Sequence, residues 1–169
     1  MSNATTESPL LSSGLNAMRF GRGFLKMLIE KTTDDIFYTP AFEGANHAAW
    51  VVGHLAYTDD CFLEDLAGQE RKVPKAWEAL FGVNSKPTSD AKIYPTRQEL
   101  MAVLDERRAA MEKWLGSLTD AELLEPIKGD IAMFAANRAQ LGSSCSFHDA
   151  FHAAQISAAR RASGLPPLF

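Results

Sequence analysis

Apolar residues recur at three- and four-residue spacing along most of this chain, and that spacing constrains the fold more than any other feature. Such a repeat places the apolar side chains on one face of an α-helix. It predicts four long helices: one from Pro9 through Ile29, then residues 46–67, 96–115 and 141–163. No alternating run is long enough for a strand. We therefore expect an all-α fold in which four long helices surround one core, a four-helix bundle.

Residues typical of helix ends support these boundaries. Thr96 and Glu99 match a capping box, in which each side chain satisfies a backbone donor of the other residue. Asn46 is the predicted N-cap of the second long helix. Gly68 ends that helix, and Gly164 ends the last one.

The chain is expected to form one domain. Residues 1–8 are polar and predict a flexible tail, and residues 9–169 predict a single bundle domain. A long connection, residues 68–95, joins the second and third long helices and includes a short predicted helix at residues 74–81. Connections of this length are usually functional, and this one can cover one end of the bundle. Gly21 and Gly23 weaken the first helix and predict close approach of a neighbouring helix.

Composition argues against several classes of partner. The net charge is −4 and no cluster of Lys and Arg is present, so we expect no nucleic-acid binding. No apolar run approaches the ~20 residues of a membrane span. The first residues lack the features of a signal peptide, which favours a cytoplasmic location. The two cysteines, Cys61 and Cys145, are too few for a disulfide scaffold and are expected to be reduced.

The histidines carry the chemistry that the sequence suggests. His148 and His152 are four residues apart, about one helical turn, so both imidazoles leave the same face about 6 Å apart and can share a metal ion. His54 lies in an apolar part of the second helix, where a buried imidazole needs a polar partner. A metal shared with the pair would provide one. The alternative is a core histidine hydrogen-bonded to a Tyr or a backbone carbonyl.

Two other residues lie near this proposed site in the sequence pattern. His47 points the same way as His54 but is about 10 Å away along the helix axis, too far to bind the same ion. Cys145 shares a face with the histidine pair, and a thiolate is a good zinc ligand. A buried, unreactive thiol is the more common role for such a cysteine. Asp149 projects about 100° away from His148.

Three neutral imidazoles around a divalent ion leave coordination positions open. Catalytic zinc sites have this form, and nickel suits the same ligands. Such an ion can lower the pKa of a water molecule, polarise a substrate or hold a thiol as its thiolate. Metal binding is expected to weaken as the pH falls through roughly 6 to 5, because coordinating imidazoles must be neutral.

The chain resembles the DinB/YfiT-like family of metalloenzymes. The resemblance covers nearly the whole chain and is carried by Trp50 shortly before His54, and by the run from His148 through His152 to Gln155. A basic tail that ends at a glycine follows. Ala154 stands where the family usually has Gly, and its methyl group could push a neighbouring helix outward.

This resemblance implies that His54, His148 and His152 form a metal-binding triad. Relatives include transferases that use low-molecular-weight thiols, and others resemble metal-dependent hydrolases. The leading hypothesis is therefore thiol transfer to a small-molecule electrophile, and hydrolysis is the alternative. A third possibility is a bundle that binds a metal or small molecule without catalysis. Relatives are often dimers, so a homodimer is also expected.

Overall fold

Helices and the loops between them make up the part of the chain that the structure, a computed structural model, describes. That part is residues 8–168, so residues 1–7 of the tail predicted at residues 1–8 lie outside it, and Ser8 is the N-cap of the first helix. The only strand-like feature of the described part is an isolated bridge between Pro126 and Asn137. The prediction of an all-α fold is thus confirmed. The helices are α1 (Pro9–Glu30), α2 (Asp34–Phe37), α3 (Ala48–Ala67), α4 (Trp77–Phe81), η1 (Ala91–Ile93), α5 (Arg97–Leu115), α6 (Asp120–Leu124), η2 (Asp130–Met133), η3 (Arg138–Gln140) and α7 (Leu141–Ala162).

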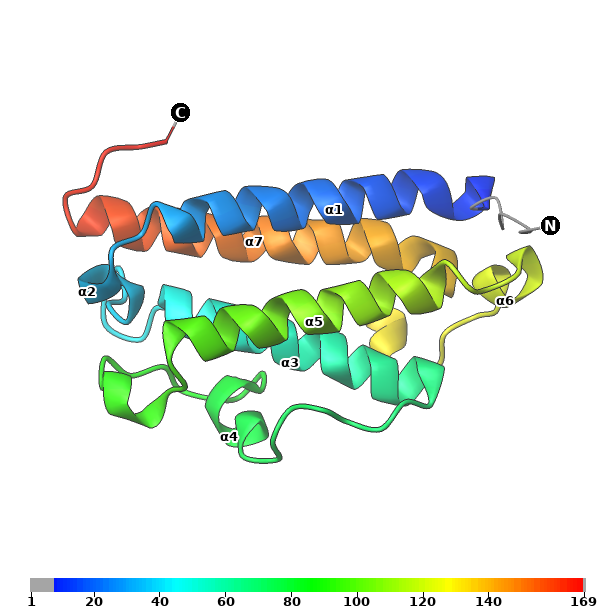
Figure 1. The fold of residues 1–169 in the computed structure, drawn as a ribbon, viewed down its shortest axis with the longest axis horizontal. Helices are drawn as coiled ribbons and strands as arrows, with labels where there is room; N and C mark the ends of the chain where they lie inside the picture. Colours follow the sequence, from blue (N-terminus) through cyan, green and yellow to red (C-terminus); the bar gives the residue numbers. More distant parts are fainter. Residues whose placement is uncertain (1–7, 169) are drawn as a thin grey trace.

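Four long helices dominate the molecule and lie side by side in two pairs (Figure 1). Helix α1 packs along α7, and α3 packs along α5. A further contact between α3 and α7 joins the two pairs. This arrangement places one face of α3 opposite one face of α7, which is where the candidate site lies.

Small residues let α1 and α7 approach closely. A Cβ atom added to Gly142 would lie only 2.5 Å from the carbonyl carbon of Gly14. One added to Gly21 would lie 2.8 Å from the Oγ of Ser146, so the prediction of close packing at Gly21 is confirmed. It is wrong for Gly23, because nothing lies within 4 Å of a Cβ added there.

The helix ends match the sequence signals with one exception. Thr96 and Glu99 form the predicted capping box, and Gly68 ends α3 in the left-handed conformation with φ of 64°. The prediction that Asn46 caps α3 is wrong. His47 is the N-cap instead, and its Nδ1 accepts a hydrogen bond from the backbone N–H of Trp50 at 3.1 Å.

The core consists of two apolar clusters. One includes Leu25, Ala56, Leu104 and Ala153, and the other includes Met18, Phe62, Met111 and Cys145. Each of the four long helices therefore contributes to both clusters. Between these positions every one of these helices carries a buried charged residue. These buried charged residues include Arg22, Asp59, Arg108 and Asp149, and α3 and α5 each carry a second one, Asp60 and Arg107.

The connection between α3 and α5 is fastened to α3. The carboxylate of Asp60 accepts hydrogen bonds from the backbone N–H groups of Lys72 and Val73, each at 3.1 Å. The chain then forms α4, whose Phe81 ring is fully buried against α3. Within the described residues, no helix has the length and apolar character needed to cross a membrane.

Candidate metal centre

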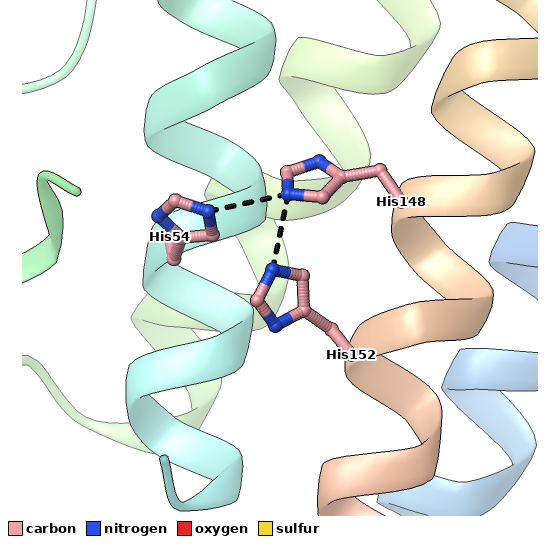
Figure 2. Close-up of side chains that lie close together, drawn as sticks. All are labelled: His54, His148 and His152. Atoms are coloured by element: carbon pink, nitrogen blue, oxygen red, sulfur yellow. Dashed lines mark hydrogen bonds between the residues drawn. The ribbon is translucent and has the colours of Figure 1, made fainter. Parts of the chain in front are cut away.

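The structure brings together the three histidines that the sequence singled out (Figure 2). His54 projects from α3, and His148 and His152 project from successive turns of α7. The Nε2 atom of His148 lies 3.3 Å from the Nε2 of His54 and 3.0 Å from the Nε2 of His152. Candidate ligand atoms of all three residues lie within 4.8 Å of one another.

The ring of His54 is held by two neighbours. Its Nδ1 lies 2.7 Å from the carbonyl oxygen of Phe81, and its face stacks on Trp50 at a centroid distance of 4.6 Å. Phe81 reaches this position because Gly53 has no side chain. A Cβ atom there would lie 2.2 Å from the Phe81 ring. The small residue before His54 therefore lets the connection supply a hydrogen-bond partner to His54.

The ring of His152 is held in a similar way. Its Nδ1 lies 2.8 Å from Oε1 of Gln155, which also accepts a hydrogen bond from Nδ2 of Asn46 at 3.1 Å. Asn46 thereby fixes the Gln155 amide so that its oxygen faces the imidazole. Partners of this kind fix the tautomer and orientation of metal-binding histidines. Sequence reasoning had left the role of Gln155 open and had given Asn46 a different role.

These contacts determine where the protons are. A carbonyl oxygen only accepts, so Nδ1 of His54 and Nδ1 of His152 both donate. In a neutral imidazole this leaves Nε2 of each ring with a lone pair. His148 Nε2 carries at most one hydrogen and can donate to only one of them. At least one of the two short contacts therefore brings two lone pairs together.

Burial keeps these rings neutral. It lowers the pKa of His148 to about 3 and that of His152 to about 4, and the neighbouring imidazoles add to both shifts. Burial also lowers the pKa of His54. His148 and His152 thus lose their protons well below the ordinary imidazole pKa of 6.5. Protonation does not relieve the lone-pair contact near pH 7.

A divalent cation fits this arrangement. Zinc binds imidazole nitrogen at about 2.0–2.1 Å, so two nitrogens of a tetrahedral site lie about 3.3 Å apart. The two Nε2 separations of 3.3 and 3.0 Å are close to this value. A cation between the three nitrogens would accept all three lone pairs at once. The cluster could therefore hold a metal ion.

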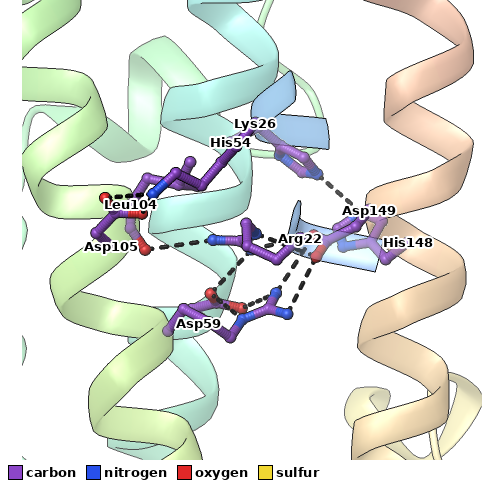
Figure 3. A network of polar contacts seen from close by, with 9 residues as sticks. Arg22, Lys26, His54, Asp59, Leu104, Asp105, His148 and Asp149 are labelled. Carbon is purple, nitrogen blue, oxygen red and sulfur yellow. Dashed lines mark hydrogen bonds and ion pairs between the residues drawn. The ribbon is translucent and has the colours of Figure 1, made fainter. Parts of the chain in front are cut away.

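A buried network of charges lies beside the histidines (Figure 3). Asp149, directly after His148, accepts hydrogen bonds from both Arg22 and Arg108 at 3.0–3.3 Å. Asp59 of α3 does the same at 2.9–3.2 Å. Two positive and two negative side chains thus neutralise one another. Sequence reasoning did not identify this network.

A pocket of about 710 Å³ opens onto the histidine cluster. His54 and His148 form part of its lining, together with residues of α3, α7, η2 and the segment after α4. His152 is not among the lining residues. The pocket therefore approaches the cluster from the side of His54 and His148.

The remaining candidates lie away from the cluster. His47 caps α3, and its Nε2 lies 3.0 Å from the carbonyl oxygen of Thr88. Cys145 is buried in an apolar cluster, and burial raises the pKa of its thiol to about 12. Cys61 is a free, partly buried thiol. Ala154 is exposed, so its methyl group does not push a packed helix outward.

Comparison with known proteins agrees with the motif in the sequence. The family model described as the DinB superfamily matches residues 18–156, which include all three histidines. A search of curated proteins found no match.

Proposed function

From the premise that this chain belongs to the DinB superfamily, we propose that it is an enzyme that uses a divalent metal to transfer a small thiol to an electrophilic substrate. His54, His148 and His152 hold the ion, which is zinc or nickel. The four long helices form a DinB-like four-helix bundle over residues 9–169, covered on one side by the long connection. The enzyme acts in the cytoplasm, as a homodimer.

One observation carries the metal assignment. The Nε2 atom of His148 faces two other imidazole nitrogens at about 3 Å and can donate a hydrogen bond to only one. Buried polar atoms in proteins are nearly always paired, so this group requires something the protein chain does not supply. A cation bound by all three nitrogens satisfies that requirement. A set of core histidines with no ligand leaves it unmet.

The surroundings favour thiol transfer over hydrolysis. When bound, the ion would lower the pKa of the thiol and stabilise the thiolate. The proton of the S–H group passes to solvent, and sulfur bonds to the electrophilic carbon. The bond from that carbon to the leaving group breaks, and the leaving group departs with the electron pair of that bond. Hydrolysis usually also needs a general base beside the attacking water. In the described lining of the pocket, Asp130 is the one carboxylate, and it is exposed.

The size of the pocket favours an enzyme over a closed metal-binding bundle. Sites for small molecules occupy roughly 300–1,000 Å³, and this pocket has about 710 Å³. It also reaches two of the three proposed ligands. A substrate can therefore enter beside the ion without displacing α3 or α7.

Metal analysis of single variants tests this proposal. Replacing His54, His148 or His152 with Ala should abolish tight binding of one ion per chain, measured by elemental analysis of protein purified without a nickel-leaching tag. Adding zinc or nickel to the metal-free protein should raise Tm, because the ion binds only the folded state.

Two controls are matched to this test. His47→Asn keeps a side chain that can cap α3 and should retain the metal, and Cys145→Ala should retain it as well. Full occupancy in His54→Ala, or loss of the metal in Cys145→Ala, would show that the ligand set is wrong. A metal-free protein that no divalent ion stabilises would support a bundle without a metal function.

A further inference from the structure

We propose that the pocket beside the metal centre binds an uncharged, largely apolar substrate and disfavours a negatively charged group that lies away from the ion. This inference rests on the proposed function, because it assigns the chemical class of the electrophile that the thiol attacks.

The lining of the pocket is mainly apolar. Phe62 comes from α3, Phe134 follows η2, and Phe147 and Phe151 come from successive turns of α7. Ile131 contributes a further apolar side chain. Aromatic and aliphatic walls stabilise a ligand mainly by removing apolar surface from water. They provide no compensation for a charge that loses its hydration.

The mouth of the pocket is apolar too. Met133 is 94% exposed, Val83 is 87% exposed and Phe147 is 72% exposed. Their placement around one opening distinguishes them from the scattered exposed apolar residues that any protein surface has. A ligand that extends outward from the ion would cover these side chains.

Few polar groups line the pocket. Apart from the two histidines they are Thr58, Ser143, Ser144 and Asp130. The hydroxyl groups can make hydrogen bonds to a neutral polar atom of a ligand. Asp130 is the one side chain in the described lining that carries a full charge, and that charge is negative.

The nearby arginines do not change this balance. Arg22 and Arg108 are both buried close to His148, but their guanidinium groups are paired with Asp59 and Asp149. No Lys or Arg is among the described residues that line the pocket. An anionic substituent away from the ion would therefore find no cation and would face Asp130.

A matched pair of small molecules tests the class of ligand. Methyl p-tolyl sulfone and p-toluenesulfonate have nearly the same shape, but only the second is charged, and a sulfonate is a poor metal ligand. Zinc-loaded, full-length protein would be titrated with each and followed by ligand-observed NMR. The sulfone should bind at least about 10-fold more tightly, which corresponds to about 1.4 kcal/mol.

A pair of variants tests whether the preference for the neutral ligand arises in the pocket. Met133→Lys adds a cation at the mouth and should narrow the difference between the two ligands. Leu124→Lys is the control, because Leu124 is also exposed but lies on α6 outside the pocket. If both variants reduced the difference in affinity between the sulfone and the sulfonate equally, the effect would come from overall charge. That result would overturn the inference. Equal affinities in the wild type, or no binding of the sulfone, would also overturn it.

A separate measurement distinguishes this inference from the proposed function. Phenylmethanethiol added to cobalt-loaded protein should produce a sulfur-to-cobalt charge-transfer band. Absence of that band would overturn metal-activated thiol chemistry. It would leave a pocket selective for the sulfone standing as a binding site for an apolar ligand.

Discussion

Two buried polar clusters lie side by side in this protein. They differ in whether every polar group has a partner within its own cluster. In the charged cluster, the guanidinium groups of Arg22 and Arg108 bond to the carboxylates of Asp59 and Asp149, so every charge has an opposite partner. In the histidine cluster, the nitrogens that face one another are mostly acceptors. The first cluster is complete without a ligand, and the second is not.

This difference separates a structural role from a functional one. A buried ionic network whose members are all paired fixes the relative positions of the helices that supply it. A buried group of acceptors without donors costs free energy unless something else binds. His148 and Asp149 are adjacent in sequence and belong one to each cluster. The rotation of α7 about its axis therefore positions a residue of each cluster at the same time.

The largest expected effect comes from breaking the charged cluster. Asp149→Asn leaves the two buried arginines with one carboxylate, and we expect the free energy of unfolding to fall by about 3–5 kcal/mol. Urea unfolding of the metal-free protein measures this. His148→Gln should change the same quantity far less, because it removes no charge partner.

The matched control is Asp105→Asn, which removes the partly exposed ion pair with Lys26. An exposed pair contributes about 0–1 kcal/mol. If Asp149→Asn were no more costly than Asp105→Asn, the charged cluster would not have the structural role assigned to it.

An intermediate effect is expected from the groups that orient the histidines. Gln155→Leu removes the acceptor for His152 Nδ1 and should weaken metal affinity by about 10- to 100-fold. The free energy of unfolding of the metal-free protein should fall by about 1–3 kcal/mol, because the buried Nδ1–H of His152 no longer has an acceptor. Competition with a chelator measures the affinity. Asn46→Ala should have a smaller effect in the same direction, because Asn46 acts only through Gln155. If neither variant changed the metal affinity, packing alone would orient His152.

The smallest effect concerns a histidine outside both clusters. Burial lowers the pKa of His47 to about 4, below the value of 6.5 for an exposed imidazole. The unfolded chain therefore binds protons more readily, and the contribution of neutral His47 to stability is lost as pH falls from about 6.5 through 4. His47→Asn supplies a cap that does not titrate.

We expect the Tm of the metal-free His47→Asn protein to fall less than that of the wild type between pH 7 and pH 5. At pH 7 the variant should be less stable than the wild type, because Asn does not fill the buried ring site and loses the contact with the Thr88 carbonyl. If the two proteins had the same pH dependence of Tm, folding would not lower the pKa of His47, and the expectation would be wrong.

The sequence indicated the histidine cluster but not the charged one. His148 and His152 are one helical turn apart, so local geometry places them together. His54 was predicted to join them because of its apolar surroundings and the family motif. Asp149 was correctly expected to point away from His148. Its partners were not predictable, because they depend on how α1 and α5 rotate against α7.

A signal for the charged cluster was nevertheless present. Arg22 continues the apolar spacing of Met18 and Leu25, and Arg108 continues that of Leu104 and Met111. A charge within the apolar stripe of a helix indicates burial, and two helices with opposite charges at such positions suggest a pair. Similarly, both Asn46 and His47 can accept a hydrogen bond, and only the path of the chain before α3 selects His47 as the cap.

The pairing of α1 with α7 has a consequence for the order of events during synthesis. A ribosome releases α1 first, and its glycine-lined face remains without its partner until α7 emerges. Contacts between such distant segments form late, so this face of α1 remains exposed in the interval. The proposed ligands are divided in the same way, with His54 early and His148 and His152 late. Before α7 is released, only one of the three imidazoles is present, so under the proposed function the metal site would form only after α7 has emerged.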